Sequence, residues 1–207
     1  MALPSKGITV ILCLIVTSSN NSVAKAQTHE GVNMKENQTN NNGTRNTYVK
    51  KMVFTAIMTA IAVVGSLLSF PVFGSKCAPV QHLVNVVCAV TVGPWWALGQ
   101  AFAASLIRNL LALGSPLAFP GSMCGALLAG LLYKYGKKLP WAYVGEVVGT
   151  GIIGGMLSFP IARLVMGNEA AALFTFVVPF LISTCGGTLI AILITVSMKK
   201  TGLLDRF

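Results

Sequence analysis

Charged side chains are scarce in this sequence, and acidic ones are the scarcest. Of its 207 residues only 10% are charged and five are Asp or Glu, whereas 54% are hydrophobic and the mean hydropathy is +0.74. Soluble domains carry about 25% charged residues. The shortage therefore excludes an ordinary soluble domain and indicates a membrane protein with several spans.

Motifs of enzymes and metalloproteins are also missing. The five cysteines include no CxxC pair and no zinc spacing, and neither HExxH nor a pair of carboxylates inside an apolar run occurs. The phosphate-binding pattern G-x-x-x-x-G-K-[ST] is absent too, so we expect no ATP binding by that route. Residues 149–154 match GxGxxG, but no strand precedes them. We therefore expect no catalytic residue, no metal and no cofactor.

The net charge of +10 does not indicate nucleic-acid binding. The basic residues stand singly or in pairs at the ends of apolar runs instead of forming one face. This distribution is typical of the positive-inside rule, in which Lys and Arg collect in cytoplasmic loops. We therefore expect a lipid bilayer around this chain and no nucleic-acid partner.

The N-terminal segment has two interpretations. Residues 1–27 resemble a secretory signal, with Lys6, an apolar run and an A-x-A site at 24–26, and residues 28–47 are Asn-rich and expected to be disordered. A cleaved signal would place Lys50 and Lys51 outside, against the positive-inside rule. Translation from Met34 would remove the conflict. Both starts stay open, and we divide the chain into a leader with a disordered segment (1–49), a membrane domain (50–200) and a tail (201–207).

Apolar runs predict an all-α integral membrane fold, a bundle of six transmembrane helices. About 20 residues cross a bilayer, and Gly93-Pro94 is a turn signal that splits one run of 31 residues. Residues 72–78 are expected to form a loop, and Pro179 and Gly186-Gly187 are possible kinks. The predicted spans are 52–70, 79–92, 95–113, 120–133, 141–159 with a possible extension past Pro160, and 170–198.

Six spans place both termini on one side of the membrane. Eight basic residues then share that side and three lie at or near the other, which predicts cytoplasmic termini. The eight are Lys50, Lys51, Lys134, Lys137, Lys138, Lys199, Lys200 and Arg206, and the three are Lys76, Arg108 and Arg163.

Polar groups concentrate at the start of the second predicted span. Gln81, His82 and Asn85 are three and four residues apart and so share one helical face, close to Lys76. Polar side chains are costly in hydrocarbon and mark functional sites by default. We therefore predict a ligand site here, although a lone intramembrane histidine is more often a packing residue.

Further polar and aromatic candidates come from three other spans. Arg108 and Asn109 lie at a similar predicted depth, where an arginine either extends to the interface or pairs with a ligand acceptor. Glu146 is the only acid inside a predicted span, and it either pairs with a neighbouring polar group or carries a proton. Phe119 belongs to one of three Phe-Pro pairs at the outer ends of spans, which could form an aromatic lid over a ring.

Several segments together resemble the ThiW family of substrate-specificity (S) components of energy-coupling factor (ECF) transporters. They are KCAPVQHLVNV, GPWWA, AFAASLIRNLLALGSPLAFPGSMCGALLAGLLY and GEVVGTGIIGG, within residues 50–198. The resemblance implies a six-helix S component in a bacterial plasma membrane that captures hydroxyethylthiazole, the thiazole precursor of thiamin. It also implies partners, a transmembrane coupling protein and ATP-binding subunits, contacted through an A-x-x-x-A face that Ala56 and Ala60 match.

The chemistry of that ligand assigns roles to the candidate residues. A small neutral ring needs an apolar wall and a few placed donors. We expect Phe70, Phe73 or Phe119 to supply the wall, and Gln81, His82 and Asn85 to bond the hydroxyl and ring nitrogen. A neutral ligand does not need the two cations Lys76 and Arg108. They therefore either pair with backbone carbonyls in the lid or indicate a phosphorylated thiazole.

Three alternative functions remain open. Glu146 could serve a self-sufficient proton-coupled carrier, which would need no coupling subunits. The ligand could be another vitamin precursor taken up by a related S component. Small-residue pairs at four-residue spacing, such as Gly121 with Gly125 and Gly145 with Gly149, predict close helix packing, and they would also suit an assembly protein that binds no small molecule.

Overall fold

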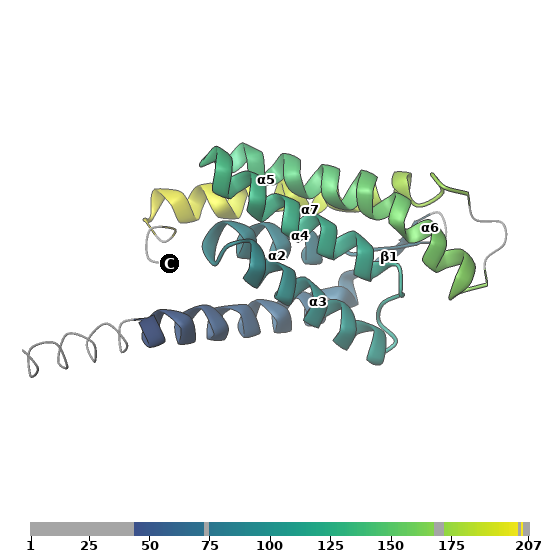
Figure 1. Ribbon diagram of the computed structural model, residues 1–207, viewed down its shortest axis with the longest axis horizontal. Helices are drawn as coiled ribbons and strands as arrows, with labels where there is room; N and C mark the ends of the chain where they lie inside the picture. Colours follow the sequence, from purple (N-terminus) through teal and green to yellow (C-terminus); the bar gives the residue numbers. More distant parts are fainter. Residues whose placement is uncertain (1–43, 73–74, 168–171, 203, 205–207) are drawn as a thin grey trace, which may run out of the picture. The chain divides into compact units, whose positions relative to one another are not determined.

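The computed structural model describes residues 44–72, 75–167, 172–202 and 204 (Figure 1). Contacts group Val49–Phe207 into one compact unit, which holds the whole predicted membrane domain. The predictions for residues 1–43, and the start of the sixth predicted span at residue 170, lie outside the described residues. The prediction of disorder is wrong for residues 44–47, which begin the helix Thr44–Leu68.

The described part of the chain contains six helical segments, which confirm the predicted six-helix bundle. The turn at Gly93 separates α2 from α3, and its φ of 94° is a conformation that glycine adopts without a steric penalty. The segments are Thr44–Leu68, which ends in η1 (Ser66–Leu68), α2 (Pro79–Thr91), α3 (Pro94–Leu110), α4 (Ala118–Gly136), the run formed by α5 (Leu139–Glu146), η2 (Val147–Gly154) and α6 (Gly155–Leu164), and α7 (Val177–Lys200).

Three of the described helices are long and apolar enough to cross a membrane: Thr44–Leu68, Leu139–Leu164 and Val177–Lys200. By contrast, α2 has 13 residues. At 1.5 Å per residue it is about 20 Å long, less than the roughly 30 Å of a bilayer core. The residues before α2 must therefore cross the rest of the bilayer core, next to the polar first turn of α2.

A β-hairpin occupies that position, where the sequence predicts a loop. β1 (Phe70–Val72) pairs antiparallel with β2 (Ser75–Cys77), with Phe70 opposite Cys77. The loop prediction over 72–78 is therefore wrong in part. Pairing satisfies backbone groups that an irregular loop would leave open in an apolar layer. The hairpin is tied to α7, because the Cys77 thiol donates to the Pro179 carbonyl at 3.4 Å and the Ala78 N–H donates to Ser183 Oγ at 3.0 Å.

Prolines in the last two helical segments leave their helices uninterrupted. The possible kink at Pro179 does not interrupt α7, which is assigned as one helix from Val177 to Lys200. Pro179 is its third residue, in the first turn, where backbone N–H groups have no intrahelical partner anyway. Pro160 lies inside α6, so the fifth span extends past it, one of the two endings that the sequence leaves open.

Glycines allow α4 to pack directly on the segment α5–η2–α6. A Cβ added at Gly149 would lie 2.7 Å from the Cys124 carbonyl oxygen, and one at Gly154 would lie 2.6 Å from the Gly121 Cα. Such distances leave no room for a methyl group. The structure thus agrees with the packing interpretation of these small residues, and the close approach brings Glu146 and Thr150 against α4.

This packing leads to a first prediction. Gly149→Ala should lower the free energy of unfolding by about 1–3 kcal/mol, because the methyl group meets backbone atoms that cannot rotate away. Gly99→Ala in α3 is the matched control, since a Cβ there meets nothing within 4 Å and alanine favours a helix. Thermal unfolding of the purified variants in detergent measures both. Equal melting temperatures for the two variants would contradict the packing argument.

Candidate functional site

The polar face of α2 points into the protein interior. Gln81, His82 and Asn85 are 3%, 8% and 0% exposed. They come from the first two turns of α2, which pack between α3, α4 and α7. Side chains of this kind are buried only where partners or a ligand satisfy them, so the surroundings of this face define the candidate site.

A cavity opens beside this face. Its volume is about 30 Å³. That is room for one or two waters, so a larger guest requires the walls to move apart. The lining residues are Lys76, Ala78, Gln81, His82, Arg108, Ser115, Ala118, Gly121, Ser122, Thr150, Phe180 and Ser183.

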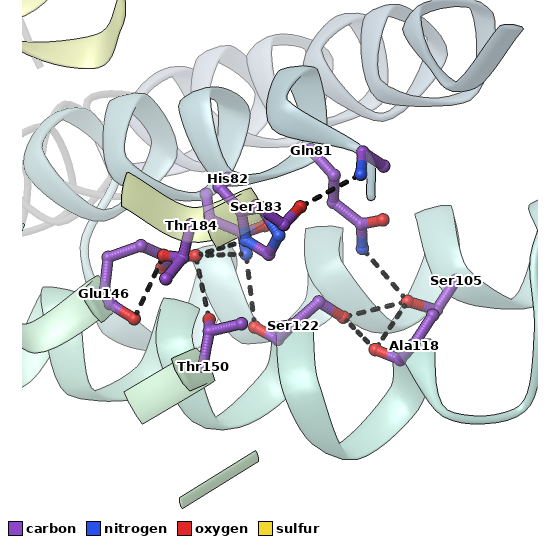
Figure 2. A network of polar contacts seen from close by, with 11 residues as sticks. Gln81, His82, Ser105, Ala118, Ser122, Glu146, Thr150, Ser183 and Thr184 are labelled. Carbon is purple, nitrogen blue, oxygen red and sulfur yellow. Dashed lines mark hydrogen bonds and ion pairs between the residues drawn. The ribbon is translucent and has the colours of Figure 1, made fainter. Parts of the chain in front are cut away.

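Glu146 is the centre of a buried polar network behind the cavity (Figure 2). Its Oε1 lies 2.9 Å from Nδ1 of His82, 3.1 Å from Nδ2 of Asn85 and 3.0 Å from Oγ1 of Thr150. The carboxyl group therefore ties α2 to the start of η2. It does not line the cavity itself but holds His82 and Thr150, which do.

The network also orients the His82 ring. Asn85 and Thr150 both donate to Glu146 Oε1, and Nδ1 of His82 lies against the same oxygen atom. This leaves Nε2 of His82 to meet a guest, as a donor or as an acceptor according to the tautomer of the ring.

A second row of hydroxyl groups joins α2 to α3 and α4 (Figure 2). Gln81 Nε2 donates to Ser105 Oγ at 3.2 Å, and the hydroxyls of Ser105 and Ser122 lie 2.9 Å apart. Asn85 Nδ2 also reaches the Ser122 carbonyl, at 3.3 Å. These bonds fix the Gln81 amide so that it presents a set orientation to the cavity.

Two cations border the cavity, in different surroundings. Lys76 is exposed, and its Nζ donates to the Ala112 carbonyl at 3.4 Å. Arg108, in the last turn of α3, is 2% exposed, and its Nε has no hydrogen-bond partner within the described residues. The cavity thus combines fixed neutral donors with one accessible and one buried positive charge.

Comparison with known proteins identifies the family. The family model described as "Thiamine-precursor transporter protein (ThiW)" matches residues 52–201. The chain belongs to the ThiW family. No curated protein matches it. Among solved structures, one described as "Structure and mechanism of the S component of a bacterial ECF transporter" is similar, with a TM-score of 0.62 and 17% sequence identity over 74% of this chain and 98% of that chain. This ThiW protein therefore has the fold of an S component and is a multi-pass membrane protein of a transporter family.

The remaining predicted ligand residues of this ThiW chain lie outside the cavity lining. Asn85 is buried behind it, bonded to Glu146. Asn109 Nδ2 donates to the carbonyls of Ser105 and Ser115 and so closes the end of its own helix. Phe119 packs against Phe102, with ring centroids 5.8 Å apart. The structure thus gives these three side chains supporting positions.

Other lining residues of the ThiW site have no strong signal in the sequence. Ser122, Thr150 and Ser183 are small hydroxyl residues within apolar runs, and Phe180 replaces the expected aromatic wall. Phe70 is 48% exposed and does not line the cavity, and Phe73 is outside the described residues. The one usable signal is spacing, because Gly121-Ser122 and Thr150-Gly151 lie within the small-residue stretches that predict close helix contact.

The predicted partner residues of the ThiW chain lie on the exposed face of the first helix. Ala56 and Ala60 are both exposed, and Val53, Ile57 and Val64 beside them are 49%, 53% and 66% exposed. The opposite face carries Ala62, which is fully buried in the core cluster with Val84 and Cys88 of α2. One side of this helix therefore packs within the chain, and the other is open to lipid or to a second protein.

Proposed function

We propose that this chain is the substrate-binding S component of an ECF-type importer and that it takes up hydroxyethylthiazole. The observation that supports this best is the inward-facing group Gln81, His82 and Asn85 beside a cavity, in a chain of the ThiW family. A lipid-facing arrangement of the same residues would have been incompatible with ligand capture.

The cavity offers what such a ring needs. Gln81 and His82 meet the hydroxyl and the ring nitrogen, since both side chains are oriented by bonds on their far sides. Phe180 supplies an aromatic wall, and Ala118 and Gly121 are small lining residues. Because the space is narrow, substrate entry widens it, and we expect the hairpin β1–β2 to move in this step, since Lys76 of β2 is one of the lining residues.

Uptake in cells tests this function. Cells that contain this chain together with coupling and ATP-binding subunits should accumulate labelled hydroxyethylthiazole, and cells with the chain alone should not. An S component captures substrate but has no motor, and the phosphate-binding pattern for ATP is missing from this sequence. Accumulation by the chain alone would contradict the proposal.

The exposed small-residue face gives a second prediction. Ala56→Trp together with Ala60→Trp should abolish co-purification with the coupling protein while leaving ligand affinity within about twofold, because small residues permit close helix approach. Leu157→Trp in α6, which is 47% exposed in the wild type, is the matched control and should co-purify normally. Retained co-purification of the double variant would place the partner surface elsewhere.

We also propose a bacterial plasma membrane location with both termini in the cytoplasm. The basic residues at the end of α4 and of α7 support it, because Lys134 and Lys199 lie in the last turns of those helices. Labelling of single added cysteines with a membrane-impermeant reagent measures the orientation. Labelling at residue 137 in intact cells would contradict it.

One observation favours a second function, a self-sufficient proton-coupled carrier. Glu146 is fully buried and its Oε1 lies 2.9 Å from Nδ1 of His82, an arrangement that a proton-carrying group could use. Glu146→Gln separates the two cases when uptake is measured without coupling subunits. Uptake that is present in the wild type and lost in this variant would favour the carrier, and the absence of uptake in both favours the S component.

A further inference from the structure

The guanidinium group of Arg108 is buried without a counterion. Arg108 lines the cavity at 2% exposure, and within the described residues no hydrogen bond or ion pair to its side chain is present. Glu146 is the only carboxylate in the described part of the chain, and the ion pair that it makes there is with His82, not with Arg108. Among the described residues, none therefore supplies a negative charge to Arg108.

Burying an unpaired charge costs free energy, and arginine cannot lower this cost by becoming neutral. A buried lysine can lose its proton, whereas arginine stays charged in proteins. An unpaired buried charge is tolerated where a ligand completes it. Lys76 adds a second cation at the mouth, and the other polar side chains of the lining are neutral or, for His82, neutral or positive. The described lining of the cavity thus carries positive charge and no acidic side chain.

We propose that the ligand of this cavity carries an anionic oxygen group, a phosphate or a carboxylate, which pairs with Arg108. This rests on the proposed function and sharpens it, because the thiazole precursor then binds as its phosphate monoester or as an acid. The planar guanidinium matches either group through two parallel hydrogen bonds. Lys76, which is accessible, closes over the same group from the hairpin side, while Gln81 and His82 face the ring.

Titration of the purified full chain in lipid nanodiscs tests the proposal. The probes are hydroxyethylthiazole, its phosphate monoester, and the same thiazole with a carboxylate in place of the hydroxyl. We expect one of the two anionic probes to bind at least about tenfold more tightly than the alcohol, because charge-assisted bidentate pairs are the strongest hydrogen bonds available. Which of the two does so distinguishes phosphate from carboxylate.

Substitution then locates the effect. Arg108→Gln should weaken the preferred anionic probe by roughly 10–100-fold and the alcohol by less than about threefold, since a neutral ligand does not use the charge. Arg108→Lys keeps the charge but loses the two parallel N–H donors of the guanidinium, so it should give an intermediate affinity. The wild-type comparison needs no variant, so it holds even if Arg108→Gln does not fold.

Two results would overturn the inference and leave the proposed function standing. One is tighter binding of the alcohol than of either anion. The other is an equal loss for the alcohol and the anion in Arg108→Gln, which would make Arg108 a structural residue. Failure of all three probes to bind the wild-type chain would overturn both the inference and the proposed function.

Discussion

Glu146→Leu should lower the free energy of unfolding by about 3–5 kcal/mol, because it leaves buried donors without their acceptor. Glu146 Oε1 accepts from Asn85 and Thr150 and lies 2.9 Å from Nδ1 of His82, and the side chain is fully buried. The same variant should lose ligand binding, since His82 is then free to turn away from the cavity. Denaturant titration of the purified protein and ligand titration measure the two losses.

A double variant separates this network from a general loss of packing. His82→Phe with Glu146→Leu removes both partners, so it should be more stable than the sum of the two single losses by about 1–3 kcal/mol. Tyr143→Phe is the control, because it removes one partly buried hydrogen bond to Thr195 of 2.8 Å and should cost only about 1 kcal/mol. Simple additivity of the His82 and Glu146 variants would show that the pair does not act as a unit.

Gly187→Ala should impair ligand binding severely, while Gly186→Ala next to it should not. A Cβ at Gly187 would meet the Pro79 carbonyl oxygen and would lie 2.7 Å from the His82 Cβ, so α2 and α7 must separate at the site. Overpacking of this kind costs about 1–3 kcal/mol, and here the strain falls on a ligand-facing residue. We expect at least a tenfold loss of affinity, which corresponds to about 1.4 kcal/mol.

Gly186→Ala is the matched control for Gly187→Ala. A Cβ at Gly186 meets nothing within 4 Å, and alanine is the better helix former, so Gly186→Ala should keep wild-type affinity and stability. Both variants have the same composition and differ by one position in α7. Equal affinities would mean that the contact between α7 and the first turn of α2 does not shape the site.

Much of the fold was predictable because its signals are local. Apolar runs of membrane length and the Gly93-Pro94 turn set the six helical segments, and α2 begins at Pro79 as predicted. The β-hairpin was not predictable, since 70–77 contains glycine, proline and lysine that read as a loop, and its pairing is stabilised by α7 through Cys77 and Ser183. Contacts over about a hundred residues leave no trace in local patterns.

The candidate site was also predictable only in part. Gln81, His82 and Arg108 were predicted from their cost in an apolar run, and the structure brings them to one cavity. The partners that complete it are hydroxyl residues such as Ser122 and Thr150, which helices tolerate anywhere because they can bond their own backbone. Glu146 was noticed as a lone acid, but its pairing with His82 depends on how α5 meets α2, which sequence spacing does not encode.

Ligand capture at the Gln81–His82 cavity is measured by equilibrium binding of the thiazole, in its alcohol and anionic forms, to the purified chain. We expect saturable binding of at least one form at one site per chain. Its affinity should fall at least about tenfold in Gln81→Leu, which removes a cavity amide, and stay unchanged in Tyr143→Phe, which lies outside the lining. No saturable binding by the wild type, or equal affinity of Gln81→Leu and the wild type, would contradict it.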